Sequence, residues 1–320
     1  LFRSFKMGDR LKGKNAVVTG GGRGIGRTVC LALAQEGANV VVCDLGGAMD
    51  GSGNQEASPA DEVVKECEAL GVKAVANYGN VASFADAEGM IKACVDNFGR
   101  VDILVNIAGI DRPKMIWNMT EEEFDQVVAV HLKGTFNTTR HAAPLMREQR
   151  YGRIINCVSE AYQGGVTHIN YGAAKGGIAS FSYGTARELG KYGVTCNVFV
   201  PRASTRMVQG DDVKKMIAKR VEAGLMTQEK ADEMAMDTMP PEYFVNFMTY
   251  LASDEAKNVN GQVFLTTPGA LGLFSQPEIV LQERHNPNED GPWSFDQCSQ
   301  ITKDKLLVNY KNPAPEQPPK

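Results

Sequence analysis

Residues 14–26 read Lys-Asn-Ala-Val-Val-Thr-Gly-Gly-Gly-Arg-Gly-Ile-Gly. A valine-rich run, residues 14–19, is followed by closely spaced glycines and then by an apolar-periodic segment, 24–36, which indicates a strand, a tight turn and a helix. Glycines in such a turn let the backbone approach a pyrophosphate, and the helix N-terminus supplies free N–H groups and a positive dipole end. The stretch predicts a nucleotide-binding turn, although glycine also serves ordinary turns, so the rest of the chain must support it.

The same strand–helix rhythm continues along the chain. Further runs rich in valine and isoleucine lie at residues 38–43, 73–77, 101–106, 153–158, 194–200 and 262–265, and helix-period segments lie at 59–70, 84–98, 121–150 and 171–191. Buried-looking strands that alternate with helices indicate a parallel sheet covered on both faces. We predict an α/β fold, a doubly wound parallel sheet (Rossmann fold) of about seven strands in the order 3-2-1-4-5-6-7.

Two interior segments and a tail interrupt this rhythm. Residues 46–58 are polar and glycine-rich, residues 208–241 are charged and rich in methionine, and the chain from 275 onward is polar and proline-rich. Adaptable methionines suit a mobile lid over a hydrophobic substrate, with an ordinary surface helical hairpin as the open alternative. We predict an N-terminal extension over residues 1–9, a Rossmann-type domain over 10–274 with its helical lid at about 208–241, and a C-terminal appendage and tail over 275–320.

Composition excludes several classes of partner. The chain has 320 residues, a formal net charge of −4 and a pI near 5.7, so no broad basic surface for nucleic acid or anionic membrane is expected. No apolar run reaches the roughly 18 residues of a membrane span, and the first six residues lack a signal peptide's apolar core. The seven cysteines form no Cys-x-x-Cys pair and the four histidines match no zinc spacing, so we expect buried thiols, a cytoplasmic protein and no metal.

A second pattern concerns proton transfer. Tyr171 and Lys175 lie four residues apart, and positions i and i+4 of a helix share a face. A free phenol has a pKa of about 10, and a neighbouring positive charge favours the phenolate and lowers that pKa. The pair then becomes a usable acid and base for a substrate oxygen, with Ser159 as a nearby hydroxyl. The plain alternative is a helix-surface pair worth a few tenths of a kcal/mol.

The nucleotide site extends to the ends of the neighbouring strands. Asp44 ends the second predicted strand, where its carboxylate can accept hydrogen bonds from ribose hydroxyls and would repel a 2′-phosphate. The Asp44 carboxylate favours NAD over NADP. Arg23, inside the turn, is the feature that argues for NADP. The alternative role for Asp44 is that of a loop residue or a helix cap. Ligands of such sheets bind at the carboxyl ends of the strands. The cofactor residues predicted there are Gly20, Arg23, Gly24, Ile25, Gly26, Asp44, Asn80, Val81, Asn106, Ala108 and Gly109.

Taken together, these motifs resemble the short-chain dehydrogenase/reductase family. The resemblance covers roughly residues 10–270 and rests on the Thr-Gly-x-x-x-Gly-Ile-Gly turn, Asn106-x-Ala-Gly, Ser159, Tyr171-x-x-x-Lys175, and Pro201 after the sixth strand. More narrowly, residues 44–47, 73–78 and 130–134 look like the (3R)-hydroxyacyl-CoA dehydrogenase domain of peroxisomal multifunctional enzyme type 2. They look equally like its bacterial single-domain relatives.

The resemblance implies an NAD-dependent oxidoreductase that interconverts a secondary alcohol and a ketone by hydride transfer. Tyr171 would be the general acid and base, Lys175 would lower its pKa and hold the nicotinamide ribose, and Ser159 would hold the substrate oxygen. Pro201, Ala203 and Thr205 would join Tyr171 and Lys175 in holding the cofactor. The resemblance also implies a homodimer or homotetramer, formed through the helix at 171–191 and the segment at 261–273.

Substrate and role keep alternatives open. A 3-hydroxyacyl-CoA fits the subgroup, and a steroid, terpenoid or aromatic alcohol fits a methionine-rich lid over an apolar pocket. For Arg202 and Arg206 three partners are open: an anionic group of the substrate, a cofactor phosphate, or solvent alone. A function of a different class is a nucleotide-binding partner subunit of a hetero-oligomer with little catalysis of its own.

Four departures from the family pattern bear on these roles. His131 stands where the wider family usually has an asparagine of a proton relay; it is interpreted as a variant relay, or as an interior histidine bonded to a backbone carbonyl. Ile107 replaces the second of two asparagines, and Arg202 replaces a glycine after Pro201. Ser159 lies twelve residues before Tyr171, where thirteen is usual, so the intervening loop is one residue short.

Overall fold

The computed structural model describes residues 8–47, 50, 58–202, 218, 221–222, 227–229, 231–232, 240–284 and 286–309. The chain divides into two compact units, Leu1–Phe274 and Ser275–Lys320, and each is described by itself. Most of the predicted lid at 208–241 and most of the predicted extension at 1–9 lie outside the described residues.

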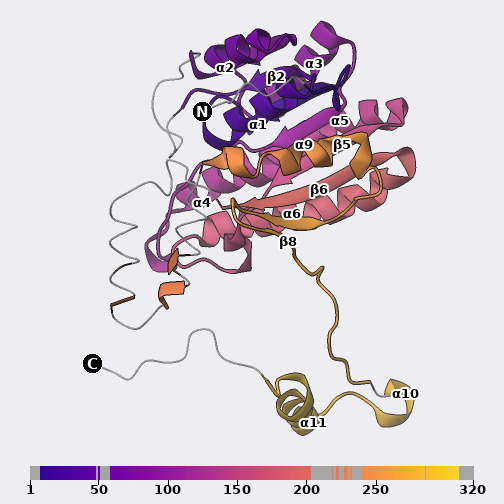
Figure 1. The fold of residues 1–320 in the computed structure, drawn as a ribbon. Helices are drawn as coiled ribbons and strands as arrows, with labels where there is room; N and C mark the ends of the chain where they lie inside the picture. The colour runs from indigo at the N-terminus through magenta and orange to yellow at the C-terminus, as the bar shows by residue number, and fades with distance from the viewer. Residues whose placement is uncertain are drawn as a thin grey trace. The chain divides into compact units, whose positions relative to one another are not determined.

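One eight-stranded sheet forms the centre of the first unit, in the order β3-β2-β1-β4-β5-β6-β7-β8 (Figure 1). The first seven strands run parallel, which confirms the predicted class and order. The strands are β1 (Asn15–Thr19), β2 (Asn39–Cys43), β3 (Ala74–Asn77), β4 (Ile103–Asn106), β5 (Gly152–Cys157), β6 (Val194–Pro201), β7 (Val263–Thr266) and β8 (Leu271–Leu273).

The eighth strand, β8, was not predicted from the sequence. It has three residues around a glycine and pairs antiparallel with β7 through a short turn. Thr267 fixes that turn, because its Oγ1 accepts hydrogen bonds from the backbone N–H groups of Gly269 and Ala270. So short a run carries no periodicity of its own, and only its pairing with β7 makes it a strand.

Helices cover both faces of the sheet, and the described residues form two large hydrophobic cores and a smaller third cluster (Figure 1). Successive strand residues serve opposite cores, as the period of two requires: Ala16 and Val18 pack in the first core, and Val17 packs in the second. The first core includes residues of α1 (Gly24–Gln35), α2 (Ser58–Ala69) and α9 (Asn246–Ala252). The second includes residues of α3 (Phe84–Phe98), α5 (Gly134–Gln149) and α6 (Ile169–Leu189).

The segment at 121–150 is not the single helix that its periodicity predicts. It consists of α4 (Glu121–Val128), a π-helical turn at Ala129–Lys133, and α5. A π turn widens the helix by one residue and alters the direction of the side chains that follow, without leaving a clear mark in the apolar pattern. His131 lies in this turn and is buried.

Parallel strands bring all their carboxyl ends to one edge. Thr19 lies level with Asn106 across the β1–β4 pair, Asn106 with Asn156 across the β4–β5 pair, and Pro201 with Thr266 across the β6–β7 pair. The loops that follow these strands are therefore gathered at the edge where such sheets bind ligands.

The second unit contains two short helices, α10 (Pro287–Asp290) and α11 (Phe295–Ile301), and a π-helical turn at Thr302–Leu306. Within the described part of the chain, no helix has the length and apolar character needed to cross a bilayer.

Candidate active site

The glycine-rich turn connects β1 to α1. A Cβ at Gly26 would overlap the carbonyl oxygen of Gly20, so only glycine allows the helix to begin this close to the strand. Arg23, at the N-cap, supplies no side-chain hydrogen bond to the first turn, and that turn contains no acidic residue. Gly24 is exposed and Ile25 packs partly against the first core. Arg23 thus leaves the first backbone N–H groups of α1 without a cap from its side chain, and such groups suit an anion.

Asp44 is fixed between the turn and the loop after β2. Its Oδ2 accepts a hydrogen bond from the Gly22 N–H at 2.9 Å, and its Oδ1 accepts one from the Gly46 N–H at 2.8 Å. Each carboxylate oxygen retains a second lone pair for a hydroxyl donor. Arg23 donates from Nη1 to the Gly47 carbonyl at 3.3 Å, which ties its side chain to the same loop.

Asn80 and Val81 follow β3 and are held by neighbouring segments. The Asn80 side chain closes a turn by accepting from the Ala82 N–H at 2.9 Å. Val81 is buried, and its carbonyl accepts a hydrogen bond from Asn137 of α5 at 2.8 Å.

Asn106, at the end of β4, is buried and bonded within the fold. Its Nδ2 donates to Asn156 Oδ1 at 2.9 Å, and its Oδ1 accepts from Thr138 Oγ1 at 2.7 Å. The side chain therefore joins β4 to β5 and α5, so a cofactor contact from this position would rest on the backbone. Ala108 lies against Gly20, and its N–H donates to Thr19 Oγ1 at 3.3 Å.

The structure brings Ser159, Tyr171 and Lys175 together. Val158 and then Ser159 follow β5, and the Ser159 hydroxyl acts on Tyr171 of α6 by lowering the pKa of its phenol. Lys175 is only 3% exposed, and its Nζ lies 5.4 Å from the centroid of the Tyr171 ring. In the short loop, a 3-10 turn at Glu160–Gln163 starts directly after Ser159, which is its N-cap.

The pKa of Tyr171 differs from the sequence-based expectation. Burial raises it above the ordinary phenol value, as do Cys157 and the charge of Asp111, while the hydrogen bond from Ser159 lowers it. Lys175 donates its hydrogen bond to the Cys157 carbonyl at 2.8 Å, and burial lowers the pKa of its ammonium. The lowering of the tyrosine pKa by Lys175 is therefore not seen in the protein alone, where burial dominates.

His131 packs against both Gly109 and Tyr171. A Cβ at Gly109 would overlap the His131 ring, and that ring lies perpendicular to the Tyr171 ring with centroids 5.1 Å apart. Burial, and secondarily the charge of Lys175, lowers the pKa of His131 to about 3, so the imidazole is neutral near pH 7. Its Nε2 lies 2.7 Å from the Ile110 carbonyl and 3.1 Å from the Ile110 N–H, so it donates to the carbonyl in one tautomer and accepts from the amide in the other. Within the described part of the chain, Nδ1 is buried without a hydrogen-bond partner.

Asp111 and His168 also lie beside Tyr171, and sequence reasoning missed both. His168 Nε2 is 3.4 Å from Asp111 Oδ2, and the His168 ring centroid is 6.1 Å from that of Tyr171. Neither residue belongs to a motif, and Asp111 lies 60 positions before the tyrosine, so no spacing signal could have found them.

The loop after β6 is described only at its start. Pro201 is the last residue of the strand, and Arg202 follows it with its N–H bonded to the Thr266 carbonyl. The Arg202 side chain forms an ion pair with Glu160. Ala203 and Thr205, predicted to hold the cofactor, and Arg206 lie outside the described residues.

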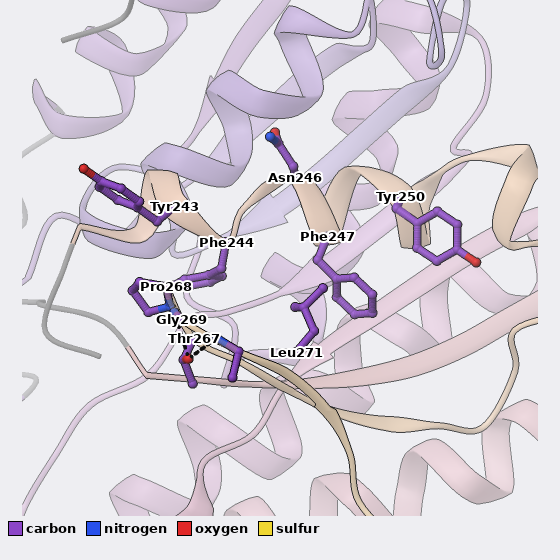
Figure 2. A pocket seen from close by; sticks show the side chains of 10 residues that line it. Tyr243, Phe244, Asn246, Phe247, Tyr250, Thr267, Pro268, Gly269 and Leu271 are labelled. Carbon is purple, nitrogen blue, oxygen red and sulfur yellow. Dashed lines mark hydrogen bonds between the residues drawn. The ribbon is translucent and has the colours of Figure 1, made fainter. Parts of the chain in front are cut away.

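A cavity of about 480 Å³ lies between α9 and the β7–β8 turn (Figure 2). Aromatic side chains dominate its lining, among them Tyr243, Phe244, Phe247 and Tyr250, and none of the predicted catalytic residues lines it. Among the residues that the structure describes, no group of His, Cys, Asp or Glu could hold a metal ion.

A doubly wound sheet with a glycine-rich turn after β1 and a group of Ser159, Tyr171 and buried Lys175 is typical of nucleotide-dependent oxidoreductases. Residues 14–215 match the family model described as short chain dehydrogenase. The chain is 40% identical to the hydroxyacyl-CoA dehydrogenase ChsB1 of Mycobacterium tuberculosis, over 84% of this chain and 82% of that protein. It is 36% identical to the peroxisomal multifunctional enzyme type 2 of Mus musculus over 87% of this chain, but spans only 35% of that larger protein.

A solved short chain dehydrogenase from Mycobacterium avium is 39% identical and superposes with a TM-score of 0.77, over 95% of this chain and 98% of that one. The chain belongs to the short-chain dehydrogenase family. It is an oxidoreductase that acts on a CH–OH group, and members of this family generally bind NAD or NADP.

Proposed function

We propose that the protein is an NAD-dependent dehydrogenase that interconverts a 3-hydroxyacyl-CoA and its 3-oxoacyl counterpart. The observation that carries the chemistry is the grouping of these side chains: the ammonium of Lys175 is buried 5.4 Å from the centroid of the Tyr171 ring, and Ser159 lowers the pKa of Tyr171. The substrate class is supported by the names of the relatives, a hydroxyacyl-CoA dehydrogenase and a multifunctional enzyme. A hydrophobic steroid, terpenoid or aromatic alcohol is the competing substrate.

The chain's own residues would move one proton. In oxidation, Tyr171 takes the hydroxyl proton as the carbon–oxygen double bond forms, and in reduction it returns that proton to the oxygen. Ser159 donates a hydrogen bond to the same oxygen and stabilises the charge that develops on it. The positive charge of Lys175 favours the phenolate that accepts the proton. A bound nicotinamide supplies the hydride acceptor or donor.

The described residues fit a dinucleotide. The N–H groups at the start of α1 are not capped by a side chain and suit the pyrophosphate. The Asp44 carboxylate, held by two backbone amides, suits the two hydroxyls of an adenine ribose and would repel a 2′-phosphate. We therefore propose NAD as the cofactor.

Turnover tests the proposed reaction. The purified chain should form NADH from (3R)-hydroxyacyl-CoA thioesters of several lengths, and a panel of hydrophobic alcohols should react more slowly. Tyr171→Phe should lower kcat by about 10²- to 10⁴-fold, because it removes the acid and base. Turnover of the Tyr171→Phe variant at the wild-type rate would disprove the acid–base assignment, and activity confined to alcohols would disprove the thioester substrate. NAD binding without any turnover would favour the partner-subunit hypothesis.

Cofactor choice has a separate test. Asp44→Asn removes the negative charge and keeps the size, so the ratio of kcat/KM with NADP to that with NAD should rise about tenfold or more. Asp96→Asn, on the exposed face of α3, is the matched control and should leave the ratio unchanged. An unchanged ratio in Asp44→Asn would remove the basis for NAD specificity.

We also propose a homodimer or homotetramer. Phe84 and Phe136 are exposed and stack, and Phe136 contacts Phe181, so α5 and α6 present an aromatic surface that association would bury. Light scattering coupled to gel filtration measures the mass. For the compartment we propose the cytoplasm, because the described cysteines are unpaired thiols, as is usual in a reducing environment.

A further inference from the structure

Glu160 and Arg202 form a two-point ion pair beside the proposed catalytic group. Arg202 Nε lies 2.5 Å from Glu160 Oε2, and Arg202 Nη2 lies 2.5 Å from Glu160 Oε1. The Arg202 side chain is 43% exposed and the Glu160 side chain is 36% exposed. Two parallel N–H···O bonds fix the relative orientation of the two groups as well as their distance.

Each partner is next to a residue of the proposed site. Glu160 follows Ser159, and Arg202 follows Pro201 at the end of β6. The two are 42 positions apart in the sequence, so the pair connects the loop after β5 to the loop after β6.

The arginine end of the pair is anchored to the sheet. Arg202 continues the β6–β7 pairing through its N–H, which donates to the Thr266 carbonyl at 3.0 Å. The glutamate end belongs to the 3-10 turn whose N-cap is Ser159, where Ser159 Oγ accepts from the Ala161 N–H at 3.3 Å. The carbonyl of Ala161 also lies where a Cβ at Gly172 would be, so the turn rests directly on α6. The ion pair therefore attaches this turn to the end of β6, in addition to the contact of the turn with α6.

Charge gives the pair a second consequence. An unpaired carboxylate one residue from Ser159 would oppose negative charge on the substrate oxygen and on Tyr171. Arg202 compensates the charge of Glu160, because its guanidinium is always protonated. The Arg202 side chain, which stands where the family usually has a glycine, thus binds a carboxylate of the same chain.

We propose that Glu160 and Arg202 are positioning residues, which hold the Ser159 turn in place and cancel the carboxylate charge beside the reacting oxygen. The proposal rests on the proposed function of Ser159 and Tyr171. It assigns neither residue a contact with the substrate.

Three single variants and one double variant separate the two effects. Arg202→Gln loses the two-point ion pair and leaves the Glu160 carboxylate uncompensated. Its kcat should fall about tenfold with little change in KM, and its pH profile of oxidation should move to higher pH. The double variant Glu160→Gln/Arg202→Gln loses the ion pair without leaving an uncompensated charge, so it should lose less activity than Arg202→Gln and keep the wild-type pH profile. Glu160→Gln leaves the guanidinium uncompensated, so it should lose less activity than Arg202→Gln and its pH profile should move to lower pH. Arg202→Lys keeps the charge but not the two-point geometry, and should also keep that profile.

One control variant and one further measurement make the result specific. Lys92→Gln breaks an exposed ion pair on α3 and should leave kcat and the pH profile unchanged. Hydrogen–deuterium exchange of the segment at 159–163 should be faster in Arg202→Gln than in wild type, with a similar thermal midpoint, because exposed ion pairs contribute little to stability.

The proposal is wrong if Arg202→Gln keeps the wild-type kcat and pH profile. It is also wrong if Arg202→Gln is at least as active as Glu160→Gln and its pH profile does not move. Absence of turnover in the wild-type protein would instead contradict the proposed function, before any variant is compared.

Discussion

At the residue scale, the protonation of Tyr171 is set by several neighbours that come from different parts of the chain. Burial and the charge of Asp111 raise the tyrosine pKa, and the hydrogen bond from Ser159 lowers it. The identity of the acid–base residue could be read from Tyr171-x-x-x-Lys175, but the direction of its pKa shift could not. Burial depends on side chains packed from other segments, and spacing within one helix contains no information about them.

Asp111→Asn should move the pH profile of alcohol oxidation to lower pH. Oxidation needs the phenolate, so its rate rises as pH passes through the pKa of Tyr171. Removing a nearby negative charge lowers that pKa, and the rising limb should shift acidward by a few tenths of a unit to about one unit. The measurement is kcat/KM for NADH formation between pH 6 and 11.

A matched control is Asp125→Asn, an exposed carboxylate on α4, which should leave the profile in place. A shift of the Asp111→Asn profile toward alkaline pH would show that this carboxylate does not act through the tyrosine.

At the element scale, the π-helical turn between α4 and α5 is the main departure from the sequence-based expectation. Apolar periodicity correctly indicated helix on both sides of residues 129–133, but it joined them into one element. The widened turn places His131 against Gly109, a residue of the loop after β4. A contact between two segments decides this local geometry, so the pattern within one segment does not reveal it.

Gly109→Ala should destabilise the fold by about 1–3 kcal/mol, because its methyl group would overlap the His131 ring and force the π turn to move. Chemical denaturation measures the free energy of unfolding. In the Gly109→Ala/His131→Ala double variant the smaller side chain makes room, so the alanine at 109 should cost less there than in the wild-type background.

Gly89→Ala is the control, since a Cβ at this glycine of α3 meets no heavy atom within 4 Å. It should not destabilise the protein, and equal costs of Gly109→Ala in both backgrounds would contradict the predicted coupling.

At the scale of the whole molecule, the two cores contain six buried thiols with raised pKa values. Burial is the first cause for each of them, and it raises the pKa of Cys67, Cys94 and Cys196 to about 12. The others with a raised pKa are Cys30, Cys43 and Cys157. The folded chain favours the protonated thiols. Their contribution to the free energy of unfolding is therefore fully present below a pH of about 8.5 and is lost as the pH rises toward 12.

The free energy of unfolding should therefore fall with pH above about 9, by up to about 1.4 kcal/mol per pH unit for each thiol that ionises only in the unfolded chain. Urea denaturation at several pH values between 8 and 10.5 measures the slope. Cys94→Ala should be less stable overall but should show a shallower slope, while Cys298→Ala, an exposed thiol of the second unit, should keep the wild-type slope. Identical slopes in Cys94→Ala and wild type would refute the thiol contribution.

The sequence by itself determined the strand–helix alternation and the glycine-rich turn, because each depends on local periodicity or on steric limits within a few residues. The alternation indicated a doubly wound sheet, and that class predicted the order of the seven parallel strands. It also predicted Ser159, Tyr171 and Lys175 as one group, which the structure assembles. Only the tertiary structure placed Asp111 and His168 beside Tyr171 and paired Glu160 with Arg202. Those contacts join segments that are distant along the chain, and the packing of the loops at one edge of the sheet decides them.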